Sequence, residues 1–134
     1  MSTLLIDTSA LHALNYAHDN NHGQAVAHFK LLAGRVKPIL TEWVFVETMN
    51  LTKARLGPGY AINFGRQLKT SKAFYPLVLT DSDKRATWDI FEQYQDKQWS
   101  YVDCSLLAIA QRLKISKVFA FDQHFTQMGL EVVP

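Results

Sequence analysis

The sequence contains a single cysteine, Cys104, so the chain cannot form an internal disulfide. This cysteine usage is typical of proteins from a reducing compartment, and we expect a cytoplasmic protein. The amino terminus lacks the basic region of a signal peptide. No apolar run approaches the ~20 residues that a membrane-spanning helix needs. The sequence therefore predicts a protein without a membrane anchor.

Neither sign of charge dominates the sequence. Its 14 basic and 12 acidic residues give a net charge of +2, which is too small by itself to predict nucleic-acid binding. The middle segment nevertheless concentrates positive side chains, which form either an RNA-binding surface or an ordinary solvated helical face. These side chains are Lys53, Arg55, Arg66, Lys69 and Lys72.

The length of 134 residues favours one domain, residues 1–134, with no linker or repeat. Short apolar runs at 4–6, 38–40, 75–79, 117–121 and 130–133 predict strands, and helical patterns separate them. We expect Thr8 or Ser9 to cap the first helix, and Pro76 to lie at a strand start or on an edge strand. Strands alternating with helices predict an α/β fold in which a central parallel sheet lies between two helical layers.

Two aspartates follow predicted strands directly. Asp7 ends the first apolar run and Asp122 follows residues 117–121. Because the carboxyl ends of parallel strands share one edge, both side chains are expected at the crevice where α/β sheets bind ligands. The alternative for Asp122 is an ordinary turn residue.

Two further acids lie on helices among apolar residues. Glu47 follows four large apolar side chains, and Asp103 falls on the apolar face of the helix that starts near Ser100. A buried carboxylate is costly without a partner. The alternative for Asp103 is a capping box with Ser100, which would only complete the helix start. Glu42 competes with Glu47, but its place in a first helical turn suits a solvated acid.

If these four acids converge, their mutual repulsion prevents all of them from being ionised without a counter-charge. Mg²⁺ prefers oxygen ligands and binds through a few carboxylates together with substrate phosphate. Bound ions of this kind polarise a phosphodiester and activate a water molecule. The four acids therefore predict a metal-dependent phosphodiesterase whose site comprises Asp7, Glu47, Asp103 and Asp122.

Four segments in this order resemble the PIN-domain nucleases, and in particular the VapC-like toxin ribonucleases. They are residues 5–11 (LIDTSAL), 41–47 (TEWVFVE), 101–104 (YVDC) and 121–125 (FDQHF). The resemblance implies that the same four acids bind Mg²⁺ or Mn²⁺ and that the substrate is single-stranded RNA. It also implies a cognate antitoxin, often a homodimer, and a role for Ser9 in lining the site. Two departures are Ala120, where many relatives have threonine, and Cys104, where alanine is more usual.

Three residues are candidates for contacts around these acids. Besides Ser9, Asn50 lies one helical turn after Glu47, and His124 follows Asp122 by two residues. His124 is placed to touch a phosphate or transfer a proton, or else it packs as a loop histidine beside Phe125. Asn50 either contacts Glu47 or the substrate, or is simply a polar helix residue.

Two other functions compete with the nuclease. An aspartyl-nucleophile phosphatase would need a second aspartate at position 9, where the sequence has serine. A non-catalytic RNA-binding or partner-binding module on the same fold ranks second, because degenerate members usually lose acids and this chain keeps all four.

Overall fold

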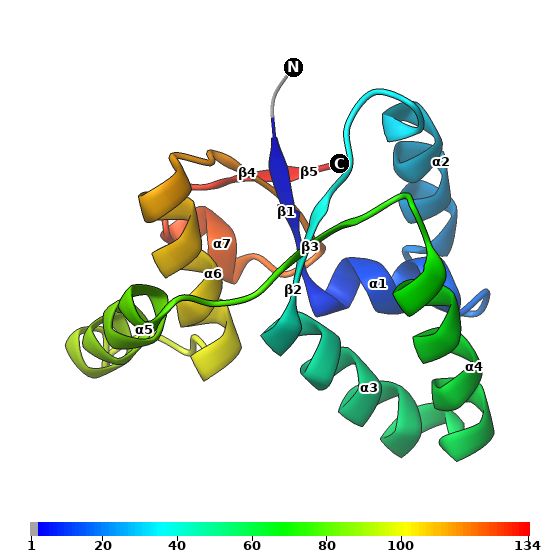
Figure 1. The fold of residues 1–134 in the computed structure, drawn as a ribbon, viewed down its shortest axis with the longest axis horizontal. Coiled ribbons are helices and arrows are strands. Elements are labelled where there is room, and N and C mark those ends of the chain that lie inside the picture. Colours follow the sequence, from blue (N-terminus) through cyan, green and yellow to red (C-terminus); the bar gives the residue numbers. More distant parts are fainter. Residues whose placement is uncertain (1–2) are drawn as a thin grey trace.

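The computed structural model describes residues 3–134, and within them a parallel sheet forms the centre of the molecule (Figure 1). Its strands are β1 (Leu4–Ile6), β2 (Ile39–Thr41), β3 (Tyr75–Leu77), β4 (Lys117–Phe119) and β5 (Glu131–Val133). They are arranged in the order β3-β2-β1-β4-β5, and every neighbouring pair is parallel. The register pairs Leu5 with Ile39 on one side and with Val118 on the other.

Helices flank this sheet on both sides. They are α1 (Thr8–Asn15), α2 (His22–Leu32), α3 (Glu42–Leu56), α4 (Pro58–Thr70), α5 (Asp81–Gln93), α6 (Tyr101–Leu113) and α7 (His124–Gln127). Figure 1 shows α5 and α6 together on one side of the strands, with α2 and α4 on the other. The predicted α/β/α fold with a central parallel sheet is therefore confirmed. None of the helices described in residues 3–134 is long and apolar enough to cross a bilayer.

The central strand β1 is the most deeply buried part of the sheet. Leu5 and Ile6 have no exposed surface, and they belong to one apolar core with Leu106 and Ile109 of α6. Burying each such side chain contributes about 1.5–3 kcal/mol to folding. This core fixes β1, and hence the residue that follows it, relative to α6.

The chain order makes the carboxyl end of β1 a topological switch point. After β1, the chain builds β2 and β3 outward on one side, and then returns to place β4 and β5 on the other. The connections therefore diverge beside β1 and leave a crevice at the carboxyl ends of β1, β2 and β4.

The structure differs from the predictions at the start of α1 and the end of β4, and agrees with them at Pro76. The cap of α1 is Asp7, rather than Thr8 or Ser9, because the helix begins directly after the strand and Asp7 is the last extended residue. Strand β4 ends at Phe119, two residues before the predicted end at residue 121. The sequence did not predict the short helix α7. The edge position of Pro76 is confirmed, because β3 is an outer strand of the sheet and proline cannot donate a backbone hydrogen bond.

Candidate active site

A cavity of about 700 Å³ opens at the carboxyl edge of the sheet, and all four predicted acids line it. Asp7 reaches it from the junction of β1 and α1, and Glu47 from α3. Asp103 reaches it from the first turn of α6, and Asp122 from the loop after β4. Four distant segments of the sequence thus bring their carboxylates to one place.

Asp7 is held by its own helix. Its Oδ2 accepts hydrogen bonds from the Ser9 backbone N–H at 3.1 Å and from the Ser9 hydroxyl at 2.7 Å. The residue is only 4% exposed, and burial raises the pKa of the Asp7 carboxyl to about 7. Nearby Asp103 and Glu47 raise this pKa further, while the Ser9 hydrogen bonds oppose the rise. Asp7 is therefore only partly ionised at neutral pH, and a bound cation would favour its ionised form.

A hydrogen bond from α1 holds the side chain of Glu47, which lies on α3. The Thr8 hydroxyl of α1 donates to Glu47 Oε1 at 2.6 Å, which fixes the glutamate over the start of α1. Burial raises the pKa of Glu47, and Asp103 and Asp122 add to the rise. Its competitor Glu42 lies elsewhere, where its Oε1 accepts the Leu79 backbone N–H at 3.0 Å.

Asp103 completes a capping box and also lines the cavity. Its Oδ2 accepts the Ser100 backbone N–H at 3.0 Å, and the Ser100 hydroxyl accepts the Asp103 N–H at 3.0 Å, which completes a capping box. The same Oδ2 lies 3.1 Å from Nδ1 of His124. The cap therefore orients a carboxylate that also faces the cavity.

Asp122 is linked to the same histidine. Its Oδ1 accepts the His124 backbone N–H at 2.9 Å and lies 3.3 Å from the imidazole Nδ1. Ligand atoms of Asp103, Asp122 and His124 all fall within 4.8 Å of one another. This closely spaced group adds an imidazole nitrogen to two of the carboxylates.

The four carboxylates have no permanent cation beside them. Across residues 3–134, no lysine or arginine nitrogen lies within 4.0 Å of Asp7, Glu47, Asp103 or Asp122. Carboxylate oxygens with one imidazole are a donor set that suits a divalent cation. The residues present therefore fit the metal site that their pattern predicted.

Three residues were predicted to lie around the four acids, and two of them, Ser9 and His124, line the cavity. Ser9 binds Asp7 and also accepts the Phe121 backbone N–H at 3.0 Å, which ties α1 to the loop before Asp122. His124 joins Asp103 and Asp122. Asn50 is not brought there. It is exposed and lines a separate groove between α3 and α4.

Sequence reasoning missed several polar residues that line the cavity. Thr8 was considered only as a cap, although it follows Asp7 directly. His12, Asn21 and Gln98 had no signal in the sequence. Arg55 was named only within a possible RNA-binding surface, although it lies eight residues after Glu47 and so returns near the same helical face.

The environment of Cys104 is unfavourable for a nucleophile, which needs an accessible thiolate. It is 1% exposed, and burial raises the pKa of its thiol, as does the nearby Asp103. Cys104 is therefore a small buried side chain within the core.

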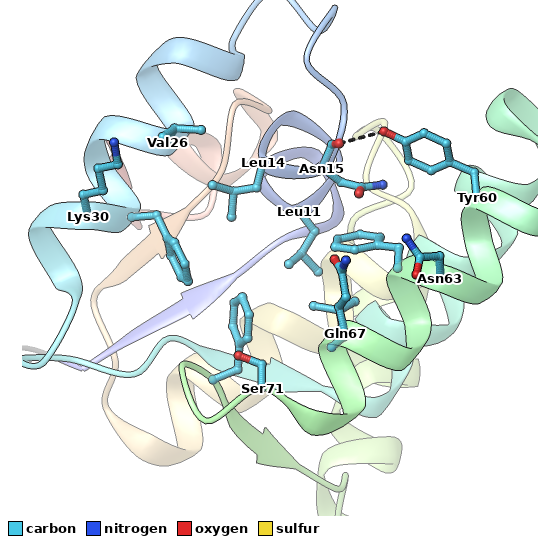
Figure 2. A pocket seen from close by; sticks show the side chains of 13 residues that line it. Leu11, Leu14, Asn15, Val26, Lys30, Tyr60, Asn63, Gln67 and Ser71 are labelled. Atoms are coloured by element: carbon cyan, nitrogen blue, oxygen red, sulfur yellow. Dashed lines mark hydrogen bonds between the residues drawn. The ribbon is translucent and has the colours of Figure 1, made fainter.

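A second cavity of about 620 Å³ lies between α1, α2 and α4 (Figure 2). Its walls are mainly apolar, including Leu11, Leu14 and Phe64, and the Tyr60 hydroxyl donates to the Asn15 carbonyl at 2.9 Å on its rim. No carboxylate or histidine belongs to its lining among the described residues. It therefore lacks the carboxylate and imidazole donors of a metal site.

Comparison with known proteins agrees with this geometry. The family model of the PIN domain matches residues 4–130. The 23S rRNA-specific endonuclease VapC20, recorded from two strains of Mycobacterium tuberculosis, is 28% identical over 133 residues, covering 98% of both chains. Two crystal structures share the fold. That of M. tuberculosis VapC20, a sarcin–ricin loop cleaving toxin, gives a TM-score of 0.86 at 23% identity over 96% of each chain. FitAcB from Neisseria gonorrhoeae gives 0.74 at 16% identity over 98% of this chain and 97% of that one.

Proposed function

The chain belongs to the PIN-domain family, and we propose that it is a metal-dependent endoribonuclease, the toxin of a toxin–antitoxin pair. The observation that carries the proposal is the convergence of four carboxylates on one cavity, with no lysine or arginine nitrogen of the described residues within 4.0 Å of them. The relative aligned over 98% of this chain is an rRNA endonuclease, which favours RNA as the substrate. The whole of residues 1–134 acts as one nuclease domain in the cytoplasm, where this RNA is found.

The proposed metal ligands are Asp7, Glu47, Asp103 and Asp122, and the ion is Mg²⁺ or Mn²⁺. When bound, such an ion polarises a phosphate oxygen and lowers the pKa of a water molecule. The chain's own contribution is to hold the ligand oxygens before the ion arrives. Ser9 orients Asp7, Thr8 orients Glu47, and Ser100 orients Asp103.

Hydrolysis by an activated water requires no covalent intermediate with the chain. This agrees with the inert environment of Cys104 and with the absence of a paired serine and histidine among the residues that line the cavity. An open cavity of about 700 Å³ suits single-stranded RNA, because the bases of a single strand can be splayed out from the backbone.

The proposed protein partner is an antitoxin whose peptide arm crosses the acidic cavity. An arginine of that arm would meet Asp103 and Asp122 in charge-assisted hydrogen bonds and replace the charge of the metal. Such binding would exclude RNA and metal together, which is how the toxin would be restrained.

The proposed homodimer has a suitable surface on α5. Trp88 and Phe91 are 53% and 42% exposed, and their rings are part of an aromatic row that continues through Tyr101 to Trp43. Exposed aromatic rows of this kind are enriched at protein interfaces. We assign this row to contact with a second copy.

The test is cleavage of labelled single-stranded RNA and of 23S rRNA by the purified protein. We expect cleavage with Mg²⁺ or Mn²⁺ and none with EDTA. The Asp7→Asn protein should lose activity because it lacks a ligand charge, whereas Asp89→Asn, on the exposed face of α5, should keep it. Equal cleavage with EDTA would contradict the metal mechanism. Tight RNA binding without any cleavage would favour the non-catalytic module.

A further inference from the structure

The positive side chains that the sequence groups together lie on two different faces of the molecule. Lys53, Arg66 and Lys69 line the groove between α3 and α4. Arg55 alone among the lysines and arginines lines the acidic cavity. The cavity is therefore strongly acidic at one end and has a single cation at the other.

One face of α3 extends from the acidic end of the cavity to the end that contains Arg55. Glu47, Leu51 and Arg55 recur every four residues, and all three line the cavity. At 1.5 Å per residue, Arg55 lies about 12 Å along the helix axis from Glu47. This separation places the backbone of Arg55 two helical turns beyond Glu47, a spacing that suits a flanking phosphate of the same strand.

Arg55 is free to bind an anion. It is exposed, and within residues 3–134 no carboxylate oxygen lies within 4.0 Å of its guanidinium. The one acid at this end, Asp19, already has other contacts. Its Oδ1 accepts the Asn21 backbone N–H at 2.8 Å, and its Oδ2 lies 3.8 Å from Nε2 of His12.

The surroundings of Arg55 also suit a nucleic-acid strand. His12 is buried beside it and shares the cavity wall with Asn21. Burial lowers the pKa of His12, and of its charged neighbours Asp19 raises this pKa and Arg55 lowers it. All three residues line the cavity. Leu51 offers an apolar surface to a sugar or base between the two ends.

We propose that Arg55 is a positioning residue that binds a backbone phosphate flanking the scissile bond, and so sets the strand along α3. The proposal rests on the proposed ribonuclease function and adds the subsite to it. A guanidinium matches a phosphate with two parallel hydrogen bonds. Such contacts fix the register of a strand without reading its sequence.

The experiment measures binding of fluorescein-labelled single-stranded RNA in EDTA, where the strand stays intact, at several KCl concentrations. Wild type is compared with Arg55→Gln, with Arg55→Lys and with the matched control Arg66→Gln in the other groove. Arg55→Gln should weaken binding roughly three- to tenfold and reduce the slope of log K against log salt by about 0.7, the value for one lost phosphate contact. Arg55→Lys should restore the slope, and Arg66→Gln should behave as wild type.

Cleavage kinetics provide the second readout. With metal present, Arg55→Gln should raise KM by a similar factor and leave kcat within about twofold, because Arg55 binds the strand and not the reacting phosphate. An unchanged salt slope in Arg55→Gln, or an equal loss in Arg66→Gln, overturns the subsite while leaving the nuclease intact. Wild-type protein that neither binds nor cleaves RNA overturns both proposals together.

Discussion

The imidazole Nδ1 of His124 lies 3.1 Å from Oδ2 of Asp103, the acid that also completes the cap of α6. The same nitrogen is 3.3 Å from Oδ1 of Asp122. One histidine side chain therefore contacts two of the proposed metal ligands. A cation that binds between these acids must either coordinate this nitrogen or displace it.

Replacing His124 should change which metal the site prefers. Imidazole contributes more to binding of later transition ions than of Mg²⁺, which selects oxygen ligands. We expect His124→Asn to lower the affinity for Co²⁺ by about tenfold, and that for Mg²⁺ much less. Titration calorimetry with each ion measures this difference. His18→Asn, an exposed histidine outside the cavity, is the control, and an equal loss for both ions would contradict coordination by His124.

The pKa of Asp7 makes metal binding release protons. With a pKa of about 7, roughly half of the Asp7 side chains carry a proton at neutral pH, and a metal ligand must be deprotonated. We expect Mg²⁺ affinity to rise with pH through 7, with about half a proton released per ion at pH 7. Calorimetry in buffers of different ionisation enthalpy counts these protons. In Asp7→Asn the release should largely disappear.

The buried carboxyl group of Asp7 should destabilise the folded protein at high pH when no metal is bound. Its folded pKa of about 7 exceeds the unfolded value of about 3.9, so the native state binds the proton more tightly. The contribution of Asp7 to the free energy of unfolding is therefore largest below about pH 4, and it is lost as the pH rises through about 7. We expect Asp7→Asn to raise the free energy of unfolding by a few kcal/mol at pH 8 in EDTA, and by little at pH 4. Urea unfolding at both pH values measures the effect, and equal changes would show that it does not come from ionisation.

An ion pair between α5 and α6 should stabilise the wall that carries Asp103. Arg112 donates to Asp83 through Nε at 2.6 Å and through a second guanidinium nitrogen at 2.9 Å, and Asp83 is 1% exposed. Burial alone would raise the pKa of Asp83, but hydrogen bonds from Arg112 and Thr80 lower it. We expect Arg112→Met to cost about 3 kcal/mol at pH 7, because it leaves a buried charge unpaired.

Because the pKa of Asp83 is lowered, this stabilisation is present above pH 4 and lost as pH falls through the folded pKa. Thermal or urea unfolding at pH 7 and pH 3 measures it. Arg85→Met, an exposed residue on α5, is the control. A loss of the same size at both pH values would indicate lost packing instead of a lost ion pair.

The homodimer proposal predicts one surface substitution with a large effect. Trp88→Lys places a charge in the exposed aromatic row, so a dimer formed through this row should dissociate. Light scattering after size-exclusion chromatography should then give the mass of one chain in place of two. Leu31→Lys changes an equally apolar residue on α2, 68% exposed, and should leave the dimer intact.

The sequence by itself determined the strands, the alternation with helices and the acids at strand ends. These features were readable because they depend on local patterns: an apolar run followed by a polar residue, and apolar positions at helical spacing. The sequence also predicted both possible places of Asp103, in a capping box and in the cavity. In the structure the same carboxylate does both. The segment order also carried the family resemblance, which the family model confirms.

Only the tertiary structure decided which residues meet. Asn50 and Arg55 lie on the same helix, five residues apart, yet α3 presents Asn50 to the groove beside α4 and Arg55 to the acidic cavity. The contact of Thr8 with Glu47 joins residues 39 positions apart, and that of His124 with Asp103 joins residues 21 apart. Such contacts depend on how α1, α3 and the loop after β4 pack around the switch point, and a local pattern contains no information about that packing.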